Sequence, residues 1–100
     1  MTLTSAGNIG IGTATPNFRL HVAADDSASV AYPGIEIEDT NTNANARNWV
    51  VTNGGNAYGA LEFAVSAAQG GVPSYTGAKM TISAAAMSAS VRRLPFMHWT

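Results

Sequence analysis

The chain has no cysteine and few charged side chains. Without cysteine, a disulfide framework, a thiolate metal site and a cysteine nucleophile are excluded. Charged residues make up 11% of the 100 residues, far below the roughly one quarter found in a typical soluble domain. Five basic and six acidic residues give a net charge of −1. This balance argues against a basic nucleic-acid-binding surface and against a polybasic membrane-binding segment.

Long hydrophobic runs are also missing, so the sequence predicts no membrane insertion. Residues 1–4 have neither the positive charge nor the apolar run of a signal peptide, and we expect none there. Large core residues are scarce among the many Ala, Gly, Thr, Asn and Ser residues. A small domain with little to bury is marginally stable by itself. The composition therefore favours at most one domain that is completed by a partner surface, for which self-association is the simplest source.

Helix patterns are poor, whereas strand patterns are short but clear. No window has apolar residues at the three–four spacing of an amphipathic helix, and Gly, Asn, Thr and Pro recur throughout. Alternating apolar and polar residues, or β-branched and aromatic residues, predict strands. The segments with these patterns are 19–22, 35–38, 48–52, 61–65 and 79–83.

Turn signals separate the expected strands. Asn53-Gly54-Gly55-Asn56 predicts a hairpin, and segments 39–48 and 70–73 have the Asn, Gly and Pro content of loops. We therefore predict an all-β fold of five or six short, mainly antiparallel strands in a sandwich-like arrangement. Strand alternation places the core candidates on common faces. They are Ile35, Ile37, Trp49, Val51, Leu61, Phe63, Val65, Met80 and Ile82.

The start of the chain is repeated near its end. Residues 1–6, Met-Thr-Leu-Thr-Ser-Ala, resemble residues 80–85, Met-Thr-Ile-Ser-Ala-Ala. Residues 86–95 look unrelated to residues 7–16. However, residues 86–95 can be encoded by a set of codons that, when the reading frame starts one base earlier, encodes Gly-Asn-Val-Gly-Ile-Gly-Thr-Ala-Ala-Pro. We therefore predict that residues 1–85 form one repeat unit and that residues 86–100 are a tail read out of frame. Such repetition is typical of arrays and fibres.

A glycine-rich motif links the chain to a known family. Residues 7–22 contain Gly-Asn-Ile-Gly-Ile-Gly-Thr-x-x-Pro-x-x-x-Leu-His-Val, which closely resembles the Gly-Asn-Val-Gly-Ile-Gly-Thr-x-x-Pro motif of bacteriophage tail-fibre proteins and related bacterial surface fibres. Segments around 35–49, 59–63 and 79–82 also resemble the repeats of those fibres. The resemblance covers residues 1–85. It implies an elongated, β-rich, intertwined homotrimer with a role in attachment, located in the virion tail fibre or on the bacterial cell surface.

The glycine spacing gives a separate argument for a fibre. Gly10 and Gly12 alternate with Ile9 and Ile11, which leaves one face of a strand bare. Backbones approach closely on such a face. We therefore expect this segment to lie near the axis of a three-chain fibre, with an edge strand in a monomer as the alternative.

Three polar patterns suggest chemistry, and each has a simpler interpretation. Gly7, Gly10 and Gly12 lack the helix that a phosphate loop needs. Asp39-x-Asn41-x-Asn43 has oxygen ligands at alternate positions, but it lacks the glycine and the distal glutamate of a calcium loop, so self-satisfied Asn turns are expected. The acidic residues of 36–39 together with Glu62 could form an acid–base pair, although a solvated strand face is simpler.

The remaining candidates are one histidine and several aromatic residues. His21 alone makes no metal site. Trp49 is flanked by valines and is expected in the core. Tyr58 and Tyr75 lie in turn-like segments and are the candidates for stacking on a host glycan. We predict no catalytic residue, no metal and no cofactor.

The expected function is that of a structural repeat in a phage tail fibre or similar attachment fibre. It would act as a homotrimeric spacer that holds a receptor-binding tip away from the particle. The alternative is a carbohydrate-binding, lectin-like module that contacts host glycans itself. An enzyme is not expected, because the sequence has no nucleophile–base or metal cluster. Nucleic acid and membrane lipid are not expected partners.

Overall fold

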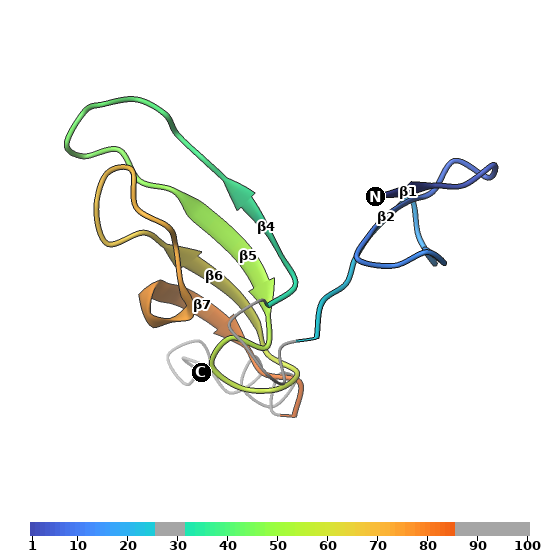
Figure 1. Ribbon diagram of the computed structural model, residues 1–100. Helices are drawn as coiled ribbons and strands as arrows, with labels where there is room; N and C mark the ends of the chain where they lie inside the picture. Colours follow the sequence, from blue (N-terminus) through green and yellow to red (C-terminus); the bar gives the residue numbers. More distant parts are fainter. Residues whose placement is uncertain (26–31, 86–100) are drawn as a thin grey trace, which may run out of the picture.

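The computed structural model describes residues 1–25 and 32–85 of the chain, which form two β-sheets (Figure 1). Of the described residues, 34% lie in strands and 4% are helical, which confirms the all-β class. The elements are β1 (Thr2–Leu3), β2 (Ile9–Ile11), β3 (Leu20–Val22), β4 (Gly34–Ile37), β5 (Trp49–Asn53), β6 (Leu61–Val65), the 3-10 helix η1 (Tyr75–Gly77) and β7 (Ala78–Ile82). The tail predicted at 86–100 lies outside the described residues.

The first sheet has the order β1-β2-β3. Strand β1 pairs antiparallel with β2, whereas β2 and β3 are parallel. The turns of this sheet need glycine, because Gly7 and Gly12 have φ angles of 86° and 82°, a region that other residues rarely adopt. The mainly antiparallel expectation therefore holds for every strand pair except β2–β3.

The bare glycine face of β2 is covered by the same chain. A Cβ on Gly10 would lie 2.4 Å from the carbonyl oxygen of Thr13, and one on Gly12 would lie 2.0 Å from that of Ala23. The close backbone approach that we expected at a fibre axis is therefore made within one copy. These glycines give no support for contact between chains.

The second sheet is a meander of four antiparallel strands in the order β4-β5-β6-β7. The loop at 54–60 joins β5 to β6, at the place where the Gly-Gly turn was predicted, and the Gly54 N–H donates to the carbonyl oxygen of Ala60. The pairing register aligns Ile35 with Val51 and Phe63, and Ile37 with Trp49 and Val65. The expected core residues therefore lie on one side of this sheet, as predicted. We call this side the apolar face.

The opposite side of the sheet is the one that is buried. It carries Thr52, Glu62 and Ala64, and the loops at 54–60 and 66–77 fold back over it. Small residues permit this close cover, since a Cβ on Gly77 would lie 2.2 Å from the carbonyl oxygen of Val65. The buried apolar side chains among the described residues are small, namely Ala60, Ala64 and Pro73. The core of the single chain is consequently small and largely polar.

The apolar face itself is uncovered in the single chain. Ile37 is 66% exposed and Trp49 is 41% exposed. Ile35, Leu61 and Met80 are also exposed, whereas Val51, Phe63, Val65 and Ile82 are half-buried. The expected core thus shares a face but is not buried within one copy, because the covering loops lie on the other side.

The chain is more extended than a compact domain of its length. Its Cα radius of gyration is 16.6 Å, against about 13 Å for a compact domain of 100 residues. Among the described residues there is no helix with the length and apolar content needed to cross a membrane. Figure 1 shows the four-stranded sheet as a twisted layer with β4 at one edge and β7 at the other.

Candidate functional site

The apolar face is the most prominent exposed feature of the described chain. It extends across all four strands of the second sheet, and no polar side chain interrupts its central rows, Ile35–Val51–Phe63–Met80 and Ile37–Trp49–Val65. Contiguous apolar patches of this kind on soluble proteins mark interaction surfaces or aggregation sites. The face is therefore the first candidate for a binding surface.

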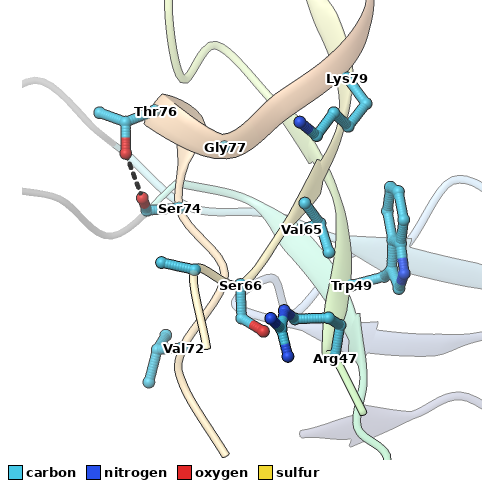
Figure 2. Close-up of a pocket in the computed structure, with 10 residues that line it drawn as sticks. Arg47, Trp49, Val65, Ser66, Val72, Ser74, Thr76, Gly77 and Lys79 are labelled. Atoms are coloured by element: carbon cyan, nitrogen blue, oxygen red, sulfur yellow. Dashed lines mark hydrogen bonds between the residues drawn. The ribbon is translucent and has the colours of Figure 1, made fainter. Parts of the chain in front are cut away.

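A cavity of about 570 Å³ lies at one end of this face. Figure 2 shows Arg47, Trp49 and Lys79 on one side of it, with Ser74 and Thr76 across from them. Strand β5 positions Trp49 and β7 supplies Lys79. Ser74 immediately precedes η1 and Thr76 lies within it, and their hydroxyl oxygens are 2.8 Å apart. The cavity thus joins an aromatic surface to cationic and hydroxyl groups.

The electrostatics of this cavity favour an anion. Its lining has two cations and no acidic side chain. The Arg47 guanidinium donates to the carbonyl oxygens of Ala44 and Ala46 at 2.9 and 2.8 Å, which fixes its position. Among residues 1–25 and 32–85, no group forms an ion pair or a hydrogen bond with the side-chain ammonium of Lys79, which is exposed on β7. A carboxylate at this place would meet positive charge that is not yet neutralised.

The two predicted glycan-contact residues lie in different shallow pockets. Tyr58 is 85% exposed in the 54–60 loop and lines one pocket, whereas Tyr75 lies in η1 and lines another. The Tyr75 ring packs edge-on against that of Tyr32, with centroids 5.7 Å apart and an interplanar angle of 82°. Tyr32 lines both pockets. Tyr58 and Tyr75 therefore line separate pockets that have Tyr32 in common.

The carboxylate of Glu62 has a structural environment. It is 0% exposed and accepts hydrogen bonds from the backbone N–H of Asn56 at 3.2 Å and from its side-chain amide at 2.6 Å. Thr81 donates to it from β7 at 3.4 Å. Glu36, by contrast, is exposed on β4 with β5 between it and β6. Glu62 therefore anchors the 54–60 loop, and its burial gives a substrate no access to an acid–base pair.

The Asn-rich loop satisfies its own backbone, as expected. The Asp39 carboxylate accepts from the N–H of Asn41, the Asn41 side chain from that of Asn43, and the Asn43 side chain from that of Asn45, at 2.7 to 3.0 Å. These Asx turns use the oxygens that a calcium ion would need. The loop is thus explained by its turn geometry.

The glycine-rich motif also forms an internal network. The Arg19 guanidinium donates to the carbonyl oxygen of Ala6 and to the side chain of Asn8. The Asn8 amide donates to the carbonyl oxygen of Pro16, and the His21 Nδ1 accepts from the N–H of Asn17. The segment after the glycines leads into strand β3, so no helix N-terminus faces a phosphate there. The motif therefore specifies the fold of the first sheet.

Three residues of interest were not selected from the sequence: Tyr32, Arg47 and Lys79. Their significance depends on contacts between distant segments, which no local pattern encodes. The one available signal was the isolation of Lys79, the only lysine of the chain, within an otherwise uncharged strand. A comparison with known protein families, curated proteins and solved structures finds no match to this chain.

Proposed function

We propose that this chain is a structural repeat of a phage tail fibre or a similar attachment fibre, in which three copies bury their apolar faces against one another. The repeat acts as a spacer that holds a receptor-binding tip away from the virion or the cell surface. The tail-fibre motif at 7–22 and the repeat of residues 1–6 at 80–85 support a place in a repetitive fibre.

The exposed apolar face is the observation that carries this proposal. Full burial of a large aliphatic or aromatic side chain contributes about 1.5–3 kcal/mol. In the single chain Ile37 and Trp49 keep much of their surface in water, while the buried apolar residues that the structure describes are two alanines and a proline. A trimer would remove these side chains from water on all three copies at once. Association therefore supplies the core that the single chain does not have.

The mass of the chain in solution tests the trimer. We expect sedimentation equilibrium to give three times the 10.3 kDa chain mass, with dissociation to monomers only on dilution. The Ile37→Ser variant places a hydroxyl on the apolar face and should shift the equilibrium toward monomer. Asn45→Ser, in the exposed Asn-rich loop, is the matched control and should leave it unchanged. A monomer mass at all concentrations would contradict the proposal.

A glycan-binding module is the second candidate, and the cavity at the end of the apolar face favours it. A half-exposed indole beside two cations suits a sugar ring that carries a carboxylate. A glycan array should then show selective binding of acidic glycans, which Trp49→Ala abolishes. A spacer predicts no specific binding on the same array.

A further inference from the structure

The two edges of the four-stranded sheet carry charges of opposite sign. We propose that these edges join neighbouring copies, so that β4 of one copy pairs with β7 of the next and three sheets close into a ring around their apolar faces. This inference rests on the proposed trimer, for which it supplies the contact between copies.

Both edges are open in the single chain. Strands β4 and β7 are the outermost strands of the sheet, and among the described residues no further strand pairs with either. All four residues of β4 are exposed, and so are Lys79, Met80 and Thr81 of β7. Open strand edges present unpaired N–H and C=O groups that are ready to pair with another chain.

The charges of the two edges are complementary. Strand β4 carries Glu36 and is followed by Glu38 and Asp39, with no basic residue between 32 and 46. The only charged residue of β7 is Lys79. Charged residues on edge strands ordinarily prevent association. Here the signs differ, so only contacts between like edges are prevented, whereas contact between β4 and β7 is favoured.

Strand direction allows this contact in a cyclic assembly. The three strand pairs of the sheet are antiparallel, so β4 and β7 run in opposite directions. Rotation about an axis along the strands preserves the direction of every strand. The β7 edge of one copy therefore meets the β4 edge of the next in antiparallel orientation, which continues the pattern of the sheet.

The charges also lie at matching heights along the strands. The pairing register places Glu36 in one transverse row with Val50, Ala64 and Ala78, the residue before Lys79. Rotation about an axis along the strands leaves this height unchanged. Lys79 of one copy consequently lies at the height of Glu36 in its neighbour, at all three interfaces of the ring.

A second acidic group reaches the cavity at the end of the apolar face. The N–H of Asp39 donates to the side chain of Asn48 at 2.8 Å, so Asp39 lies at the height of Arg47, which precedes Asn48. In the ring, Asp39 of the neighbouring copy approaches the opening that Arg47 and Lys79 line. In this arrangement the cationic cavity is thus occupied by Asp39 of the next copy, which follows β4 by two residues.

The same charges disfavour a twofold dimer. An isologous contact pairs an edge with the same edge of the other copy. In such a dimer β4 would meet β4, and acidic residues would face acidic residues. A β7–β7 contact would likewise place Lys79 near Lys79. The heterologous arrangement is the one in which unlike charges meet, and a heterologous contact that closes forms a ring.

Charge exchange in the full-length chain tests this inference. Lys79→Glu and Glu36→Lys, each alone, should lower the trimer association constant about tenfold or more, because each acts at three interfaces. The combined Glu36→Lys/Lys79→Glu variant should restore most of the wild-type value.

Ala14→Glu/Ala57→Glu is the control for Lys79→Glu, because it makes the same change in net charge at two exposed positions away from both edges. Sedimentation equilibrium gives the constants, and circular dichroism verifies that each variant is folded. The milder Lys79→Gln serves if Lys79→Glu does not fold.

The outcomes separate this inference from the proposed function. A wild-type trimer that neither reversal weakens, or a double variant that weakens it additively, would overturn the edge pairing and leave the trimer intact. A wild-type dimer would overturn the ring. A wild-type monomer would contradict the proposed function, and the edge pairing with it.

Discussion

A few buried polar side chains hold the sheet and its loops together at the residue scale. Glu62 anchors the 54–60 loop, and Asn48 connects three segments. The side-chain oxygen of Asn48 accepts from the N–H of Asp39, and its amide donates to the carbonyl oxygen of Gly71, both at 2.8 Å. The Asn48 N–H donates to the Ser66 hydroxyl at 3.0 Å. Buried polar groups are costly unless they are paired, so each member depends on its partners.

Glu62→Gln should lower the free energy of unfolding by about 1–3 kcal/mol. The two carboxylate oxygens now accept from both nitrogens of Asn56. In the Gln variant an NH2 group replaces one of these oxygens. It would face an N–H donor of Asn56 and could not accept its hydrogen bond. Urea denaturation followed by circular dichroism measures the change.

Asn45→Asp exchanges the same two groups at an exposed position and is the control. It should change the free energy of unfolding by no more than about 0.5 kcal/mol. Equal stability of Glu62→Gln and the wild type would mean that the buried carboxylate does not anchor the loop.

At the element scale, much of the second sheet could be predicted from the sequence. The expected strands at 35–38, 48–52, 61–65 and 79–83 correspond to β4 to β7 within one residue at each end. This agreement follows from alternation, which is a local property, and from the turn residues between the strands. The shared apolar face could be predicted for the same reason.

The covered side of that sheet could not be predicted from alternation. The loops fold over the polar face because small residues and hydrogen-bonding groups lie there. Gly55 shows this, since a Cβ on it would lie 2.7 Å from the Glu62 carboxylate and 2.6 Å from Tyr75. Contacts between segments so distant in the sequence leave no periodic signal. The position of Trp49 beside Arg47 and Lys79 was missed for the same reason.

Gly12→Ala tests the role of the glycine motif in the first sheet. The added Cβ would lie 2.0 Å from the Ala23 carbonyl oxygen, at a φ of 82°. We expect the free energy of unfolding to fall by about 2 kcal/mol or more.

Gly70→Ala separates backbone strain from steric overlap. Gly70 has a φ of 73° and nothing within 4 Å of its added Cβ. Gly70→Ala should therefore lower the free energy of unfolding only by the cost of a left-handed backbone, about 1–2 kcal/mol. If Gly12→Ala were no more costly than Gly70→Ala, the close approach at β2 would not matter.

At the scale of the whole molecule, the chain consists of two sheets with little apolar core of their own. The nucleotide sequence tests its place in a longer repetitive protein. We expect the DNA that encodes residues 86–95, read one base earlier, to continue as Gly-Asn-Val-Gly-Ile-Gly-Thr-Ala-Ala-Pro. Codons that give no such motif in any frame would contradict the predicted frame slip and restrict the repeat to its short match at 80–85.

The central claim is that the apolar face is buried between copies, and thiol reactivity at that face tests it most directly. The chain has no cysteine, so Ile37→Cys places a single reactive thiol at a position that is 66% exposed in one copy. Asn45→Cys places the same group in the exposed Asn-rich loop. Alkylation rates of both variants are measured from dilute to concentrated protein. We predict that the Cys at position 37 becomes at least about tenfold slower to react as concentration rises, in parallel with the mass, while the Cys at position 45 keeps its rate. Equal and constant rates at the two positions across the whole concentration range would contradict the account.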